Sequence, residues 1–498
     1  SVSEPDCAEL LKEPSRAINP KEQIEMRIAS IDQGTTSTRA LIVNTDSKLE
    51  IVHSIEHQQF FPHDGWVEHN PDELIRNIQA CVDAVGEVDA IGIDNQGESC
   101  LAWNSDTKEA LSPVIVWQDK RTTVVIDKLK SDGLEEETFL RAGLPLDPYF
   151  SASKLAWIVQ HNQKAKDALA IGKLRIGTTD AFFLDRLTGH FVTDVSTASR
   201  TSLMNLKTLN WDPHLCDLFR VPLQCLPKIV PTTGDFGAIK TQYRQTPVIA
   251  SIVDQQAALY GFGCRQKGES KITFGTGAFA LMVTGDEIIN NPKLGLLPTV
   301  AWQKNGEDPV FAVDGGVYTA SAAINWARSL GLFSEFSEIN TFCTPPAIES
   351  GLAFVPALTG LGCPYWDPHA RGVWFGLSLD HTAQQMMQSI LEGIAFRASE
   401  VIAAMSSCIP SKGPIFIDGG MSKNPYFVQF FANMVQREVC PASMPELTGL
   451  GTIQLASDFL GHRLETIPQF GSFKPEPEGY RSGKMFKKAI KMSRQWGK

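Results

Sequence analysis

The residues of this chain that could do chemistry lie in short polar segments that follow apolar runs. Asp254 comes directly after the run VIASIV and precedes the segment QQAALYG. A carboxylate at the end of a strand, facing a cleft, can accept the proton of a substrate hydroxyl. The same residue could instead cap the helix that the following small residues predict. Both interpretations of Asp254 are open from its local sequence.

Two turns rich in glycine and threonine are candidates for binding phosphate. In the first, IDQGTTST, Gly34 lets backbone amides approach an anion, and Thr35 and Thr36 can donate their hydroxyls. Asp32, at the start of this turn, could hold a hydrated Mg²⁺. The second turn, FGTGAF, places Thr276 between two glycines. Either turn alone fits an ordinary hairpin, but two of them favour a phosphate held from two sides.

A third segment, IDGGMSKN, fits a loop that faces a nucleotide. Gly419 and Gly420 leave room for a flat base or a ribose, and Asn424 can hydrogen-bond it. A plain turn between a strand and a helix is the alternative. The chain has no G-x-x-x-x-G-K-[ST] segment and no H-R-D paired with D-F-G, so P-loop enzymes and protein kinases are excluded.

Aromatic side chains accompany these polar segments. Trp117 lies in PVIVWQDKRT, and Tyr149 and Phe150 lie in DPYFSASKLAW. Aromatic faces beside polar tips suit a small polyhydroxylated ligand, whose C–H face can pack against them. Single aromatic residues at such positions more often belong to the core, so both interpretations stay open.

The elements that must position these residues begin with a β-β-β-α-β unit. Apolar runs predict strands around residues 28–31, 40–43 and 49–60, and the first two flank the first Gly/Thr turn. A helix is expected over 71–85, followed by a buried strand at 88–94. The apolar face of this helix comprises Leu74, Ile78, Val82 and Val85.

The second half of the chain repeats this arrangement. A strand, a Gly/Thr turn and a strand are expected over 270–285, and a strand, a glycine loop and a helix over 414–435. A long helix is expected over 382–405, with a stripe formed by Met387, Leu391, Ile394, Ala398, Val401 and Met405. The repetition indicates duplicated α/β domains with a cleft between them. The boundary is expected near residues 260–268, whose glycines are typical of an exposed segment.

Length and charge limit the function classes. The chain has 498 residues, and single cores stop growing at about 250–300 residues, so at least two domains are expected. The formal net charge of −11 excludes an extended nucleic-acid footprint, and no apolar run is long enough to span a membrane. Ten cysteines without a C-x-x-C pair indicate reduced thiols rather than a zinc site. The polar opening segment resembles neither a secretory signal nor a transit peptide, so a cytoplasmic location is expected.

Together these segments resemble the FGGY family of carbohydrate kinases. The resemblance rests on IDQGTTSTRA, GWVEHNPDEL, IVWQDKRT, DPYFSASKLAW, DQQAALYG, FGTGAFALM, FVPALTGLGCPYWDPHARG and IDGG. It implies an α/β fold of two actin-like (ribonuclease H-like) domains that close over ATP, Mg²⁺ and a small polyol, in a dimer or tetramer. The expected division is a polar extension at 1–26, a polyol-binding domain at 27–262 and an ATP-binding domain at 263–498.

The resemblance also implies a role for each matching residue. Nucleotide contacts fall on Asp32, Gly34, Thr35, Thr36, Arg39, Thr276, Gly277, Gly315, Asn325, Gly420, Met421 and Asn424, although the family commonly has Gln where Asn325 stands. The polyol pocket falls on Glu98, Trp117, Tyr149, Asp254, Gln255 and Phe279. The implied reaction moves the γ-phosphoryl group of ATP to a terminal hydroxyl, with glycerol as the first candidate and glycerol 3-phosphate as product. Asp254 would accept the proton, and Asp32 would hold Mg²⁺.

One segment departs from the family pattern. Residues 95–99 read NQGES, where family members that phosphorylate glycerol have N-Q-R-E-T. Gly97 therefore stands in place of an arginine, whose guanidinium would supply five N–H donors. Glycerol turnover could fall roughly 10–150-fold, since a hydrogen bond to a charged group contributes about 1.5–3 kcal/mol. Alternatively, the void admits a larger polyol or a ketose, or Lys120, Arg121 or Lys154 supplies the missing cation.

Two other functions compete with a polyol kinase. The chain could be a ligand-binding paralogue with weak catalysis, which Gly97 would allow, or an actin-like assembly ATPase. The intact Asp32, Thr276 and Asp254 argue against the first alternative. The combination of Trp117, Tyr149 and Glu98 argues against the second, because an assembly ATPase needs no pocket for a polyol.

Overall fold

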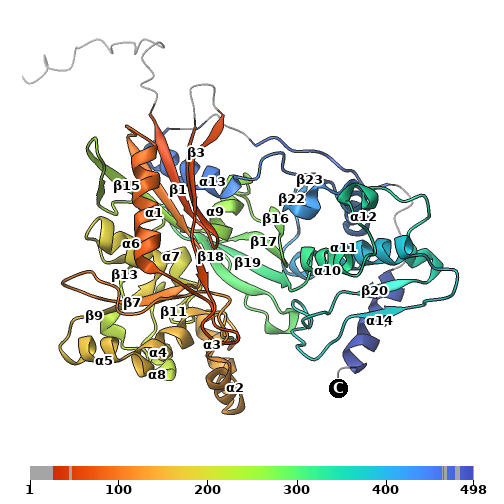
Figure 1. Ribbon diagram of the computed structural model, residues 1–498, viewed down its shortest axis with the longest axis horizontal. Coiled ribbons are helices and arrows are strands. Elements are labelled where there is room, and N and C mark those ends of the chain that lie inside the picture. Colours follow the sequence, from red (N-terminus) through yellow and green to blue (C-terminus); the bar gives the residue numbers. More distant parts are fainter. Residues whose placement is uncertain (1–25, 44–47, 463, 465–467, 477–482, 497–498) are drawn as a thin grey trace, which may run out of the picture.

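The computed structural model describes residues 26–43, 48–462, 464, 468–476 and 483–496. The polar extension expected over 1–26 therefore lies, except for its last residue, outside the described residues. The two halves of the chain lie side by side, and each contains a six-stranded sheet (Figure 1).

The first sheet has the strand order β14–β15–β6–β1–β2–β3. Its strands are β1 (Ile28–Gln33), β2 (Ser37–Val43), β3 (Leu49–Glu56), β6 (Ala90–Asn95), β14 (Ala238–Lys240) and β15 (Gln245–Val253). β2 runs antiparallel to β1 and β3, whereas β6 runs parallel to β1 and to β15. The parallel strands β1, β6 and β15 therefore end at one edge of the sheet, where loops can converge on a ligand.

The second sheet has the order β18–β19–β17–β16–β22–β23. Its strands are β16 (Ser270–Phe274), β17 (Ala278–Gly285), β18 (Leu297–Trp302), β19 (Val310–Val317), β22 (Ile415–Gly419) and β23 (Val439–Pro441). β16 pairs antiparallel with β17 and parallel with β22, as β1 pairs with β2 and β6. The predicted duplication of the α/β unit is confirmed, because each sheet contains a Gly/Thr hairpin whose first strand pairs in parallel with a later strand.

Smaller strands extend the first half. A five-stranded sheet contains β4 (Gln59–Phe60), β5 (Glu68–His69), β7 (Cys100–Asn104), β8 (Val114–Ile115) and β9 (Leu174–Thr178). The strand expected over 49–60 is thus divided, since β3 ends at Glu56 and β4 joins another sheet. Two-stranded sheets are formed by β10 (Val192–Asp194) with β13 (Lys228–Val230), β11 (Met204–Asn205) with β12 (Asn210–Trp211), and β20 (Ala353–Val355) with β21 (Val373–Phe375).

The two helices predicted from apolar periodicity are present. α1 spans Pro71–Ala84, and Asn70 caps it by accepting hydrogen bonds from two backbone amides of the first turn. α11 spans Ala383–Cys408, begins with a capping box at Thr382 and ends three residues beyond the predicted limit. The six residues of its predicted stripe are all buried, in the core of the second half.

The other helices cover the sheets and the small subdomains. In the first half they are α2 (Thr123–Ser131), α3 (Glu135–Ala142), α4 (Ser151–His161), α5 (Gln163–Ala170), α6 (Thr179–Leu187), α7 (Val195–Ala198), α8 (Pro213–Phe219) and α9 (Asp254–Gly261). In the second half they are α10 (Ser321–Ser329), α12 (Pro425–Val435), α13 (Leu447–Phe459) and α14 (Gly483–Trp496).

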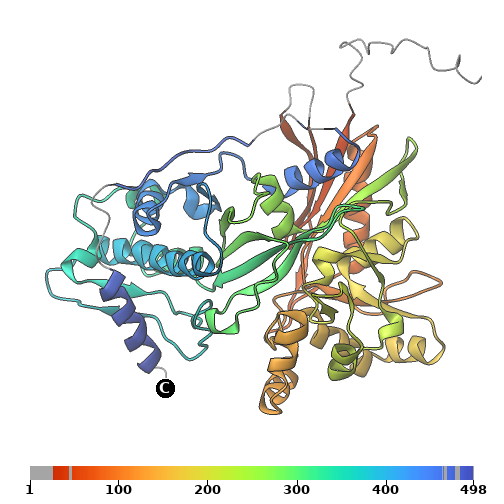
Figure 2. The ribbon, with the colours of Figure 1, turned by 180° about the vertical axis from the view of Figure 1, so that it is seen from behind.

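Helix α13 comes from the C-terminal half of the sequence but packs on the first sheet. It lies against α9, β1 and β6, and the blue helix beside the red strands in Figure 2 shows this crossing. Thr452 of α13 donates a hydrogen bond of 2.9 Å to Asp94 of β6. The C-terminal half therefore contributes to the core beneath the first Gly/Thr turn.

The segment 260–268, expected to be exposed, is largely internal, which corrects that expectation. Tyr260, Phe262 and Cys264 are buried in the core that α9 and α13 share. The glycines here reflect close packing as well as turns, which the sequence could not distinguish. The division of the chain at 262/263 stays a prediction.

Two glycines allow α9 and α13 to pack in close contact. A Cβ at Gly451 would overlap the carbonyl oxygen of Ala257, and a Cβ at Gly261 would overlap that of Leu447. We expect Gly451→Ala to reduce the free energy of unfolding by about 1–3 kcal/mol, the usual cost of overpacking. Thermal unfolding measures the effect, with Gly483→Ala as the control because nothing lies within 4 Å of a Cβ there. Equal melting temperatures for the two variants would contradict this account of the crossing.

Candidate active site

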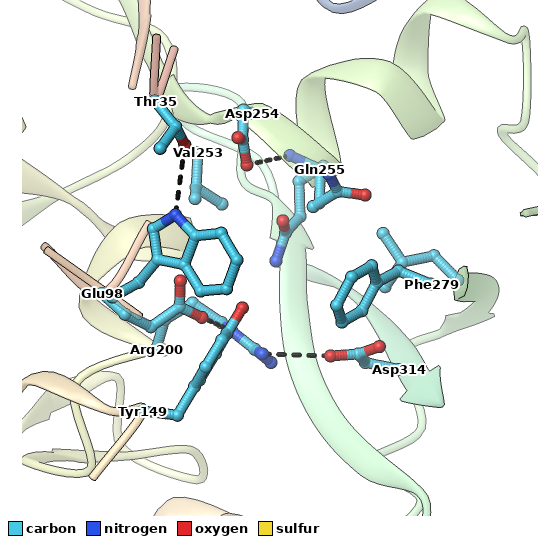
Figure 3. Close-up of a pocket in the computed structure, with 12 residues that line it drawn as sticks. Thr35, Glu98, Tyr149, Arg200, Val253, Asp254, Gln255, Phe279 and Asp314 are labelled. Carbon is cyan, nitrogen blue, oxygen red and sulfur yellow. Dashed lines mark hydrogen bonds and ion pairs between the residues drawn. The ribbon is translucent and has the colours of Figure 1, made fainter. Parts of the chain in front are cut away.

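A cavity of about 170 Å³ lies between the two halves, at the edge where β1, β6 and β15 end. It is lined by Thr35, Glu98, Trp117, Tyr149, Arg200, Val253, Asp254, Gln255, Gln256, Phe279, Leu281 and Asp314 (Figure 3). The structure thus brings together all six residues of the expected polyol pocket. A cavity volume of about 10–15 Å³ is enough for one water molecule, so this cavity has room for a small polyol.

Asp254 is the first residue of α9, and its carboxylate lines the cavity. Its Oδ1 accepts a hydrogen bond of 2.6 Å from the backbone N–H of Gln255, and no side-chain cap is formed at this helix terminus. Burial, followed by the nearby carboxylates of Glu98 and Asp32, raises the pKa of Asp254 to about 7. A carboxyl group with this pKa can accept a proton at neutral pH. The helix-cap interpretation of Asp254 is therefore not what the structure shows.

The NQGES segment forms a tight turn that directs Glu98 into the cavity. The backbone N–H of Ser99 donates a hydrogen bond of 2.7 Å to the carbonyl of Gly97, which closes a three-residue turn. Glu98, in the middle, has a φ of 60°, a conformation that is strained for a side chain of this size. The Ser99 hydroxyl accepts a hydrogen bond from the Trp117 amide. The turn therefore positions two residues of the cavity wall.

The space beside Gly97 is not the void expected from the sequence. A Cβ built on Gly97 would lie 2.7 Å from Cγ2 of Val253, closer than real side chains approach. Val253 itself lines the cavity. Its side chain thus occupies the region where a side chain at position 97 would begin, which the sequence could not reveal.

None of the three cations expected as a substitute lines the cavity. Lys154 is buried in α4, where its ammonium donates to the carbonyls of Pro148 and Tyr149. Arg121 pairs with Glu68 and Asp119 beneath the ring of Trp66.

Lys120 is exposed. The cation that enters the cavity is Arg200, whose Nε donates to Glu98 at 2.7 Å and whose Nη2 donates to Asp314 at 3.0 Å. Arg200 belongs to the first half and Asp314 to β19 of the second, so this pair bridges the cleft (Figure 3).

Aromatic residues form one wall of the cavity. The indole N–H of Trp117 donates to the hydroxyl of Thr35 at 3.1 Å, which links this wall to the first Gly/Thr turn. Tyr149 packs edge-on against Trp117, with ring centroids 5.6 Å apart. Phe150 belongs instead to a buried apolar cluster, as the core interpretation allowed. Burial raises the pKa of Tyr149 well above its ordinary value, so its hydroxyl stays protonated.

Lys271 holds Gln255 in place. Its buried ammonium donates hydrogen bonds of 2.6 Å to Oε1 of Gln255 and 2.9 Å to the hydroxyl of Thr273. Burial lowers the pKa of Lys271, and Asp418 and Asp254 oppose this effect. Because the carbonyl oxygen of Gln255 is engaged, its amide nitrogen is the end that remains free to donate to a ligand.

The first Gly/Thr turn is ordered by its own contacts. The backbone N–H of Gly34 donates to the carbonyl of Ser37, and Arg39 forms an ion pair of 2.6 Å with Asp32. Thr36 is exposed. Among the described residues no three His, Cys, Asp or Glu side chains form a cage for a metal ion. Asp32 offers a single carboxylate at this turn. That fits Mg²⁺ bound by one carboxylate, phosphates and water, which is the usual arrangement for that ion.

The second Gly/Thr turn is docked on the start of α10. The carbonyl of Thr276 accepts hydrogen bonds from the amides of Ala320 and Ala322. Gly420 lies beside Ser321, since a Cβ at Gly420 would be 3.8 Å from the Ser321 hydroxyl. That hydroxyl is buried and has no hydrogen-bond partner among the described residues. The orphaned hydroxyl, next to two glycine loops, fits a site for a polar ligand such as a nucleotide.

The remaining residues expected at the nucleotide lie outside the cavity. Asn325 is exposed on α10, four residues after Ser321 and hence on the same face. Asn424 caps α12 and donates to Ile339, while Met421 is buried in the core. A Cβ at Gly315 would meet α11, so this glycine packs the strand on the helix. Their nucleotide contacts stay predictions.

Sequence reasoning missed five cavity residues, namely Arg200, Val253, Gln256, Leu281 and Asp314. Val253 and Gln256 flank a recognised pair, so neighbourhood alone could have flagged them. Arg200 lies in the run STASRTS, where a charged residue among small hydroxyl residues was a usable signal. Asp314 and Leu281 carry no local signal, because only the facing sheet brings them to the cavity.

Both halves of the chain match models of one known protein family. Residues 27–261 match the N-terminal domain of the FGGY family of carbohydrate kinases, and residues 270–457 match its C-terminal domain. The chain belongs to the FGGY family. It is accordingly a kinase that transfers a phosphoryl group from ATP to an alcohol group, with the predicted two-domain actin-like fold.

Glycerol kinases are among the relatives of this FGGY kinase. That of Haloferax volcanii is 34% identical over an alignment covering 95% of this chain and 99% of the relative. That of Vibrio cholerae is 36% identical, covering 94% and 97%. The crystal structure of Plasmodium falciparum glycerol kinase with ADP superposes with a TM-score of 0.87 at 28% identity, covering 94% and 98%. In the part of this chain that the structure describes, no helix has the length and apolarity to cross a membrane.

Proposed function

We propose that this FGGY kinase phosphorylates a terminal hydroxyl of glycerol, giving glycerol 3-phosphate, with Asp254 as the general base. The observation that carries the proposal is the cavity in which Asp254 faces Glu98 and the aromatic wall. The similarity to glycerol kinases over almost the whole chain supports glycerol as the substrate.

The geometry supports an in-line transfer. A terminal hydroxyl next to Asp254 loses its proton to the carboxylate as its oxygen bonds to the γ-phosphorus of ATP, and the bond to ADP breaks. The faces of Trp117 and Phe279 pack against the carbon chain of the polyol. The amide nitrogen of Gln255 donates to one of its hydroxyls, and Lys271 holds Gln255 in this orientation.

The nucleotide would lie along the two Gly/Thr turns. Thr35, Thr36 and Thr276 donate to phosphate oxygens, and Gly420 and the Ser321 hydroxyl face the nucleoside. Mg²⁺, bound by Asp32 and the phosphates, would neutralise the charge that develops during transfer. Because ATP is the phosphoryl donor, we expect the enzyme in the cytoplasm, and we expect a dimer or tetramer.

A substrate panel tests the proposal. ADP release with Mg-ATP is coupled to NADH oxidation, and kcat/KM is measured for glycerol, erythritol, threitol, xylitol, dihydroxyacetone, erythrulose and xylulose. We expect glycerol to lead by tenfold or more. Absence of stimulation by every member would refute polyol kinase activity and favour a ligand-binding protein.

A larger polyol or a ketose is the second candidate substrate, because Gly97 removes the guanidinium that the glycerol-phosphorylating pattern carries. In the same panel a four- or five-carbon compound would then lead. The chemistry at Asp254 would be unchanged, and only the substrate assignment would move.

A further inference from the structure

The guanidinium of Arg200 is buried in the cavity with one end unpaired. Its side chain is only 7% exposed, and Nε and Nη2 are engaged by Glu98 and Asp314. Its Nη1 has no hydrogen-bond partner among the described residues. A buried donor without a partner costs free energy, so a ligand that accepts from it is favoured. Figure 3 shows the group held between the two carboxylates.

A side chain at position 97 cannot supply the cation that binds the substrate. At position 97 a side chain would collide with Val253, because its Cβ would lie 2.7 Å from Cγ2. Val253 therefore presents methyl groups where a cation at position 97 would emerge, and it presents no donor. Within the residues that line the cavity, Arg200 is the one cation.

The charges around Arg200 limit the class of substrate. Its single positive charge faces the carboxylates of Glu98 and Asp314, with Asp254 a third acid on the same cavity. An anionic ligand brought into this site would meet a net negative environment. Like charges placed close together in a poorly hydrated site repel strongly, so neutral ligands are favoured.

We propose that Arg200, rather than a residue at position 97, is the cation that binds the phosphoryl acceptor, with Nη1 donating to a hydroxyl or carbonyl oxygen of a neutral polyol or ketose. Val253 and Gly97 form a matched pair, because the Val253 side chain fills the space into which a side chain at position 97 would extend. This inference rests on the proposed function, since it assigns the acceptor of the same site.

The first test is Arg200→Lys, which keeps the positive charge between Glu98 and Asp314 but replaces the planar guanidinium with an ammonium group. We expect KM for the best polyol of the panel to rise 10–150-fold, the value of one hydrogen bond to a charged group. KM for ATP is expected to stay within threefold, although loss of an ion pair lowers the melting temperature. A purely structural role would instead change both KM values.

Arg397→Lys is the matched control, because Arg397 is also buried but donates to Glu400 and to the carbonyl of Cys363 in the second half. It should leave KM for the polyol unchanged. If the wild type is stimulated by a polyol and Arg200→Lys has the same KM for it within twofold, the assignment of Arg200 is wrong. Absence of stimulation of the wild type is a separate result, which refutes the proposed function itself.

A second test examines the matched pair. Gly97→Arg alone should reduce kcat/KM for the best polyol at least tenfold, because of the collision with Val253. Gly97→Arg with Val253→Ala removes Cγ2 and should recover at least fivefold of that loss. Unchanged or improved activity of the single variant would show that position 97 is open, and would overturn the pairing.

A third test needs no variant and examines the restriction to neutral acceptors, whether or not Arg200→Lys folds. The wild type is assayed with D-glycerate and D-erythronate beside glycerol and erythritol. We expect kcat/KM for each sugar acid to be at least 100-fold below that of the corresponding polyol. Equal values would show that Arg200 recruits an anion and would overturn the restriction to neutral acceptors.

Discussion

Asp254→Asn is expected to lower kcat by roughly 10²–10⁴-fold, the usual contribution of a positioned general base. Asparagine has nearly the same shape but cannot accept the proton of the attacking hydroxyl. Because the replaced carboxylate is buried beside Glu98 and Asp32, the variant should fold as well as the wild type. Steady-state ADP release with saturating ATP and polyol measures the effect, and Asp217→Asn, at an exposed position on α8, is the control.

The pH dependence supplies an independent check on Asp254. Its pKa is raised to about 7, and only the deprotonated form can accept a proton. The kcat/KM of the wild type should therefore fall tenfold for each pH unit below about 7, and this acid limb should be absent from the residual activity of Asp254→Asn. An acid limb centred near pH 4, or a variant with more than a tenth of wild-type kcat, would place the base elsewhere.

Gly277→Ala is expected to reduce kcat/KM for ATP by about 100-fold. A Cβ at Gly277 would lie 2.6 Å from the carbonyl oxygen of Val317 and 3.0 Å from that of Tyr318, so the backbone of the second Gly/Thr turn must shift. Displacing a positioning group by about 1 Å can cost roughly 10²-fold in rate. The measurement is ADP release at varied ATP and a fixed, saturating polyol concentration.

Gly275→Ala is the matched control for this turn. The atom nearest to a Cβ at Gly275 is the carbonyl oxygen of Gly277 at 3.9 Å, which is ordinary contact. The same chemical change, two residues away, should therefore reduce kcat/KM for ATP only a few-fold. Similar losses in both variants would mean that loop flexibility, and not the space beside Gly277, determines the effect.

The local pattern of the sequence was sufficient for most of the secondary structure that carries the site. The apolar spacing of Leu74, Ile78 and Val82 determines a helix because one buried face is enough to anchor it. The two Gly/Thr turns likewise determine hairpins, because their flanking residues form antiparallel partners close in sequence. Short-range geometry of this kind needs no knowledge of the rest of the chain.

The sequence by itself determined that this chain carries a family pattern, two Gly/Thr turns and a carboxylate after an apolar strand. Only the tertiary structure decided which charged groups line the cavity. The glycine in NQGES indicated a void and a missing cation, whereas the fold fills the space with Val253 and brings Arg200 from about a hundred positions away. Asp314 comes from the facing sheet. The physical reason is that side-chain spacing along a strand or helix is fixed locally, while steric exclusion and charge pairing across a cleft depend on residues that only folding brings together.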